Sequence, residues 1–125
     1  MRAVRIDVDA SVVEVDMGVD ELDDVVGGSR ERIALTADLD MWVESTEPAC
    51  NRKAALLAVH CGVPFRRYGG AVVVTGNVDG QAIGLSREKA HALCGLANLL
   101  GDVLALTCEA SGPWRSRLRR ELQCV

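Results

Sequence analysis

The chain has 125 residues, of which 49% are hydrophobic and 26% charged. This length and hydrophobic share are enough for one buried core without metals or disulfides. Its net charge of −4 argues against non-specific binding to duplex nucleic acid, because that affinity comes from Lys and Arg side chains that replace counterions on many phosphates. No apolar run approaches the roughly 18 residues of a membrane-spanning helix, so the sequence predicts no membrane partner.

The charges are unevenly distributed along the chain. Residues 1–47 carry thirteen acidic and four basic side chains, whereas residues 48–125 carry five acidic and ten basic ones. These counts correspond to net charges of −9 and +5. The sequence therefore predicts a molecule with an acidic and a basic side.

The first half predicts two antiparallel strand pairs around a short helix. Apolar and polar side chains alternate in residues 2–8 and 11–17, and the polar step between them is short enough for a hairpin. Residues 19–26 change to a helical period and end at a pair of glycines. Residues 31–37 and 39–46 alternate again and predict the second pair. The second strand places three apolar side chains on one face, which we expect to be buried: Val13, Val15 and Met17.

The second half begins with a helix and a strand pair. Asn51 is a good N-cap for a helix over residues 52–61, whose apolar side chains recur at helical spacing. Residues 71–75 form a β-branched run typical of a central strand. After a glycine-rich turn over residues 76–80, residues 81–85 predict a short strand that returns beside it.

The remaining chain predicts two more helices. Ser86 caps the longest one, over residues 87–100, and Gly101 is its expected end. Residues 103–107 are compatible with a strand or a helical extension, and we expect a strand. A basic amphipathic helix follows over residues 113–125. The predicted fold class is α+β, in one domain over residues 1–125: a mostly antiparallel sheet of five to seven short strands, two main helices packed on it, and this C-terminal helix.

Cysteine usage predicts reduced thiols and a cytoplasmic protein. The five cysteines are an odd number, no pair has Cys-x-x-Cys spacing, and no secretory segment precedes them. They are Cys50, Cys61, Cys94, Cys108 and Cys124.

Two His–Cys pairs raise the question of a metal site or a nucleophile. His60 and Cys61 are adjacent and would point about 100° apart on a helix, so they do not readily chelate one ion together. His91 and Cys94 have better spacing, but both thiols occupy apolar stripes, where cysteine behaves as a small hydrophobe. We therefore favour core packing, and predict no metal, no cofactor and no catalytic residue.

The candidate ligand-binding residues are Arg66, Arg67 and Tyr68, which precede a glycine pair. Two guanidinium groups and a ring are suited to binding and stacking on an anion such as a nucleotide. The alternative, a solvated loop, is the interpretation that we favour. The neighbouring glycine-rich turns do not have the spacing of a phosphate-binding loop.

Two charged segments are candidates for partner binding. The C-terminal helix combines an apolar stripe with arginines, which is suited to docking on a partner; packing on its own domain or in a homodimer is the alternative that we favour. Its candidate partner-binding residues are Trp114, Arg115, Leu118, Arg119 and Leu122. The acidic cluster of Asp20, Glu21, Asp23 and Asp24 is suited to imitating a phosphate track, although a solvated helix face explains it as well.

Four short segments carry a family resemblance. They are Met-Arg-Ala-Val-Arg-Ile at the start, Val25-Val26-Gly27-Gly28, Asn51 before an Ala-rich helix, and the run from Gly70 to Gly76. Over roughly residues 1–85 they resemble a family of small uncharacterised domains of bacteriophages and actinobacterial mobile elements. The residues before Asn51 depart from the more polar sequence usual there. The resemblance implies an accessory protein acting inside a bacterium, and it carries over no activity or catalytic residue.

Three function classes follow from these patterns. The first is a non-enzymatic phage or mobile-element accessory protein that binds and modulates a host protein, as a monomer, a homodimer or a higher oligomer. The alternative is an oligomeric protein that binds or sequesters a small ligand such as a nucleotide at Arg66, Arg67 and Tyr68. The third is a small enzyme that uses one of the His–Cys pairs. We rank the accessory protein first.

Overall fold

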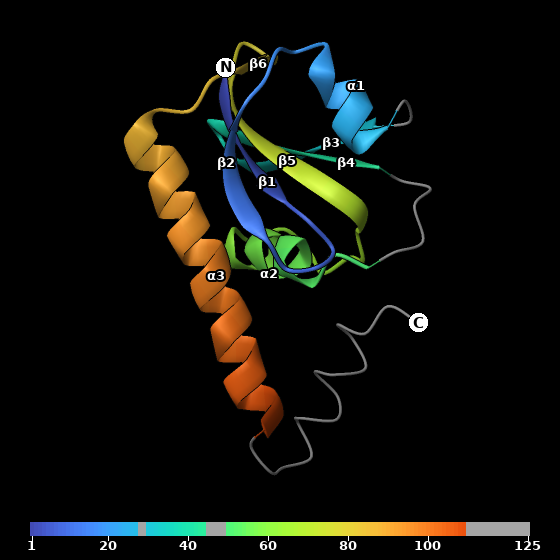
Figure 1. The fold of residues 1–125 in the computed structure, drawn as a ribbon, viewed down its shortest axis with the longest axis vertical. Coiled ribbons are helices and arrows are strands. Elements are labelled where there is room, and N and C mark those ends of the chain that lie inside the picture. Colours follow the sequence, from blue (N-terminus) through green and yellow to red (C-terminus); the bar gives the residue numbers. More distant parts are fainter. Residues whose placement is uncertain (28–29, 45–49, 110–125) are drawn as a thin grey trace.

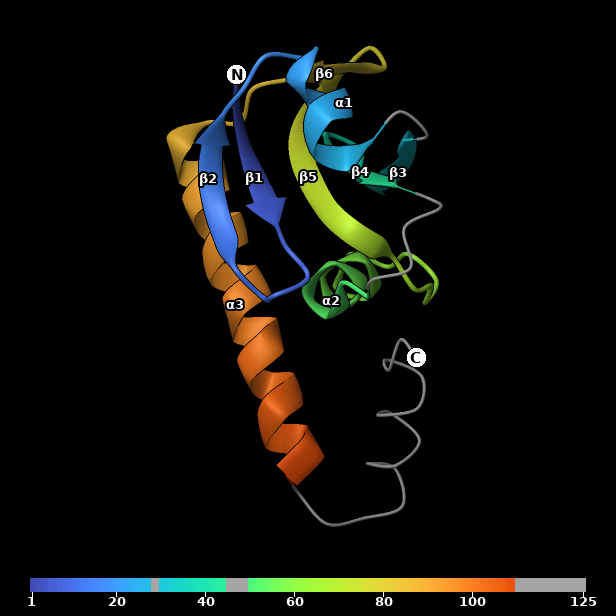
Figure 2. The same cartoon turned by 45° about the vertical axis from the view of Figure 1, so that its right-hand side comes forward.

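The computed structural model describes residues 1–27, 30–44 and 50–109, with side chains to Val103 in the last helix. In this part of the chain three helices lie against a six-stranded antiparallel sheet (Figures 1 and 2), which confirms the predicted α+β fold. The elements are β1 (Arg2–Ile6), β2 (Val12–Asp16), α1 (Glu21–Val26), β3 (Arg30–Thr36), β4 (Leu39–Glu44), α2 (Arg52–His60), β5 (Gly69–Val78), β6 (Gln81–Ile83) and α3 (Arg87–Glu109).

The valine-rich strand β5 forms the centre of the sheet. The strand order is β2-β1-β5-β4-β3, and β6 also pairs with β5. Val74 of β5 lies opposite Val4 of β1 on one side and Met41 of β4 on the other. Val72 and Val73 are 0% exposed on opposite faces, so the β-branched run is covered on both sides, as expected of a central strand.

Helices cover both faces of the sheet, but to different extents. α2 and α3 pack over the larger core on one face, whereas the short α1 covers part of the other (Figure 1). Leu22 and Val26 of α1 pack on Ala3 and Val73 there. Within the described part of the chain, the sheet face beneath α1 is therefore only partly covered by a helix.

The end of α3 differs from the sequence prediction. The helix does not stop at Gly101 but continues to Glu109, so the strand expected over residues 103–107 is wrong. The apolar run over residues 103–107 is too short for its periodicity to distinguish a strand from a helix. A single glycine such as Gly101 weakens a helix but does not end it. The predicted helix over residues 113–125 lies outside the described residues. Among the described helices none is both long and apolar enough to cross a membrane.

Two smaller predictions about the strands are also corrected. Val13 was expected to be buried with Val15 and Met17, yet it is 45% exposed because β2 is an edge strand. The predicted turn over residues 76–80 is shorter in the structure. β5 continues to Val78, and the chain reverses at Asp79 and Gly80, which have φ angles of 53° and 80°.

Candidate functional site

Arg66 and Tyr68 lie together as the sequence suggested, but Arg66 already has an acidic partner. Its two terminal nitrogens donate to the two carboxylate oxygens of Glu31 on β3, each at 2.7 Å. Hydrogen bonding to Arg66 lowers the pKa of Glu31, and the same contact raises the pKa of Arg66. An anion would have to displace Glu31 to reach this guanidinium.

Tyr68 packs in the core and does not form an exposed stacking surface. Its side chain is buried in the larger core, with the Arg66 guanidinium 5.3 Å from the ring centre. Burial raises the pKa of its hydroxyl, which has no hydrogen-bond partner among the described residues. Arg67 is exposed. Arg66 and Tyr68 are therefore less accessible to a nucleotide than the sequence suggested.

The thiols on the helices pack in the core, as predicted. Cys61, at the end of α2, and Cys94, on α3, are free and partly buried against the larger core. Burial raises both pKa values, and the nearby Glu14 carboxylate raises that of Cys94 further, which disfavours the nucleophilic thiolate. Within the described residues no group of three or more His, Cys, Asp or Glu side chains is placed to hold a metal ion.

Cys50 corrects the expectation of five reduced thiols. It lies directly before the N-cap of α2, pairs through its backbone with Gly69, and is disulfide-bonded. The side chains of Cys108 and Cys124 are outside the described part of the structure. An odd cysteine count excludes a complete set of pairs but not a single bond between distant residues, which is why the sequence argument failed here.

The other charged candidates are divided between described and undescribed residues. On α1, the acidic side chains of Asp20, Glu21, Asp23 and Asp24 are exposed, and Asp23 forms an ion pair with Arg30 at 3.0 Å. Their exposure agrees with a solvated face. The five partner-binding candidates from Trp114 to Leu122 lie outside the described residues, as does the whole helix predicted over residues 113–125.

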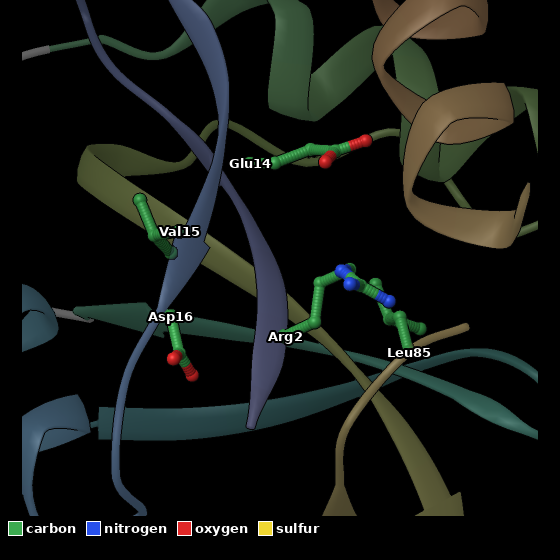
Figure 3. Close-up of a pocket in the computed structure, with 5 residues that line it drawn as sticks. All are labelled: Arg2, Glu14, Val15, Asp16 and Leu85. Carbon is green, nitrogen blue, oxygen red and sulfur yellow. The ribbon is translucent and has the colours of Figure 1, made fainter. Parts of the chain in front are cut away.

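A groove beside the edge strand β2 is the candidate site that the sequence did not indicate. It has a volume of about 450 Å³ and is lined by Arg2, Glu14, Val15, Asp16 and Leu85. Because three consecutive residues of β2 line it, the groove borders the backbone of that strand as well as its side chains. Figure 3 shows Glu14 and Arg2 extending from β2 and β1 toward α3 and Leu85.

The hydrogen-bond register of the first hairpin shows which backbone groups face outward. Met17 N donates to Met1 O and Asp7 N donates to Ser11 O, so the odd-numbered residues of the second strand pair with β1. In an antiparallel ladder the alternate residues turn their N–H and C=O groups to the opposite edge. Val12, Glu14 and Asp16 therefore present these groups on the outer side of β2, where no described strand pairs with them.

The carboxylates of this edge differ in their surroundings. Asp16 lies 3.2 Å from the N-terminal ammonium group of Met1 and opposite Arg2 in the ladder. Glu14 is exposed, lies opposite the buried Val4, and pairs with no basic side chain among the described residues. The edge thus combines outward backbone groups with a carboxylate that no described cation neutralises.

A second, smaller cavity is lined in part by a lysine that connects several elements. It measures about 320 Å³ and lies between the β1–β2 turn and the start of α2. Lys53 donates from Nζ to the Ala10 carbonyl at 2.6 Å and to Asn98 Oδ1 at 2.7 Å. These bonds connect α2 to the hairpin turn and to α3, so the lysine has a structural role.

Comparison with known proteins finds no matching family model, no matching curated protein and no matching solved structure.

Proposed function

We propose that the protein is a non-enzymatic accessory factor of a phage or mobile element, which acts in the cytoplasm of a bacterial host by binding and modulating a host protein. The observation that carries the proposal is the outer edge of β2, with which no described strand pairs, beside a groove of about 450 Å³. An exposed strand edge is a template for pairing with another chain, so a protein that keeps one open is suited to binding a protein segment.

The other sheet edge is less suited to the same role. β3 has a register irregularity between Ala34 and Thr36, and its side chains Arg30, Glu31 and Arg32 each take part in an ion pair. Bulges and charged side chains are the devices by which proteins prevent pairing at an edge. β2 has a continuous five-residue register with β1, and of its charged side chains Glu14 and Asp16 only Asp16 takes part in an ion pair within the described residues.

The proposal is tested by purifying the affinity-tagged full chain from the bacterial host and examining the eluate by native mass spectrometry. We expect a protein partner in a fixed ratio, with a complex that weakens as salt increases if charge contributes to recognition. Recovery of the chain without any partner, or turnover of a substrate by the purified chain, would contradict the proposal.

The nucleotide-binding alternative ranks second because Arg66 is held by Glu31 and Tyr68 is buried. A rise in melting temperature with a nucleotide, lost in Arg67→Ala, would reverse this ranking.

A further inference from the structure

We propose that the partner segment is an extended chain with a basic residue between apolar ones, which adds to the sheet at the outer edge of β2. This inference rests on the proposed function and names the chemistry of the partner. It starts from the outward N–H and C=O groups of Val12, Glu14 and Asp16, which offer an antiparallel ladder to a new strand.

The side chains of β2 determine what the added strand should carry. A residue paired with Glu14 would place its side chain on the same face, beside the carboxylate and above the groove. Since Glu14 has no basic partner among the described residues, a Lys or Arg at that position would supply one. Asp16 already has Met1 and Arg2 beside it, so the requirement for a cation is strongest at Glu14.

The opposite face of the edge favours apolar side chains. Val13 is 45% exposed and Val15 is partly buried, and both lie on the face of β2 opposite to that of Glu14. Residues flanking the basic one would lie against these valines and cover them. The recognised pattern is therefore apolar–basic–apolar in an extended segment.

A second copy of this chain fits the edge less well. Pairing two β2 strands about a two-fold axis at Glu14 would place two carboxylates directly opposite each other, which is destabilising. The acidic excess of residues 1–47, with thirteen acidic and four basic side chains, also favours a basic partner over an identical one.

The test uses three capped peptides and the full-length protein. The first probe is Gly-Ser-Thr-Val-Lys-Val-Thr-Ser-Gly, the second has Glu in place of Lys, and the third carries a methyl group on the backbone nitrogen of Lys. Binding is measured by NMR titration of the backbone amides. We expect the Lys peptide to shift the amides of Val12, Glu14 and Asp16. The Glu and N-methyl peptides should bind roughly tenfold more weakly, because one loses the charge pair and the other a ladder hydrogen bond.

A charge exchange separates recognition from loss of folding. Glu14→Lys should weaken binding of the Lys peptide and strengthen binding of the Glu peptide. An unfolded variant would not show this reversal. Asp24→Lys makes the same charge change on the exposed side of α1 and should leave both affinities within about twofold of the original, because surface charges far apart are screened.

Each contrary outcome has a distinct meaning. Equal binding of the N-methyl peptide, or no effect of Glu14→Lys, would overturn pairing at this edge. Amide shifts at β2 that depend on protein concentration without peptide would show a second copy as the occupant, and would overturn the inference too. If a host partner were captured equally by the original chain and by Glu14→Lys, the accessory function would stand while this inference failed.

Discussion

Asn51 connects three elements through one buried side chain. Its Oδ1 accepts from Ala54 N at 3.2 Å and caps α2, while its Nδ2 donates to Ile6 O at 2.8 Å and to Gly70 O at 2.9 Å. We predict that Asn51→Ala lowers the free energy of unfolding by about 3 kcal/mol, because it removes a cap and leaves two carbonyl groups without this donor. Urea denaturation measures the change. A loss below about 1 kcal/mol would show that these bonds contribute little.

The ion pair between Glu31 and Arg66 gives a prediction about pH. Since the folded-state pKa of Glu31 is below its ordinary value of 4.5, the pair stabilises the fold above that value, and the stabilisation is lost as the pH falls through the lowered pKa. Both side chains are about two-fifths exposed, so solvent screening limits the effect to at most about 1 kcal/mol. Glu31→Gln should therefore destabilise the protein at pH 7 and not at pH 2.

Urea denaturation at the two pH values measures this difference. Glu21→Gln is the matched control, because Glu21 is exposed on α1 and forms no ion pair within the described residues. The same loss for Glu31→Gln at both pH values would contradict the argument from the lowered pKa.

At the scale of elements, two glycines of α3 give a matched pair of predictions. A Cβ atom at Gly95 would meet nothing within 4 Å, whereas one at Gly101 would lie 2.7 Å from Cε of Lys53. Gly95→Ala should raise the free energy of unfolding by about 0.5–1 kcal/mol, because alanine loses less entropy in a helix. Gly101→Ala should raise the free energy of unfolding by less than Gly95→Ala, or lower it. The reason is that Lys53 must move from its hydrogen bonds to Ala10 and Asn98. Urea denaturation compares them, and equal gains would contradict this role of Lys53.

Elements were predictable where their signals were local. The first hairpin, the Asn51 cap and the valine-rich strand each follow from neighbouring residues, and the structure confirms all three. The continuation of α3 past Gly101 was not predictable in this way, because the choice between helix and strand over residues 103–107 depends on context that an apolar run does not contain. The exposure of Val13 was missed because a strand's alternation does not show whether the strand lies at an edge.

At the scale of the molecule, the candidate site depends on strand order. The alternation of residues 11–17 predicted a strand, but only the pairing of β1 with β5 leaves β2 at the outside. The groove also needs Leu85, which reaches β1 by donating from its backbone nitrogen to Arg2 O at 2.8 Å. Such contacts join residues far apart in the chain, so the sequence pattern did not contain them. Conversely, the basic Arg66 and Arg67 suggested a site because the sequence did not show Glu31 beside Arg66.

The redox state of Cys50 tests the proposed compartment. The bacterial cytoplasm keeps thiols reduced, so there we expect the disulfide at Cys50 to be open, and to form when the purified protein is oxidised. Alkylation in intact cells, followed by mass spectrometry of the peptide that contains Cys50, measures this state. Cys61 and Cys94, which are free in the structure, are internal controls after denaturation. A Cys50 protected from alkylation inside cells would contradict the cytoplasmic location.

The central position of β5 also determines when the protein can fold during synthesis. The hairpins β1–β2 and β3–β4 have local partners, but neither joins the other until β5 lies between them. β5 begins at Gly69, so a ribosome must release more than half of the chain before the sheet can close. Until then both hairpins expose strand edges to the surrounding solution, and such edges are the places where strands of other chains can pair.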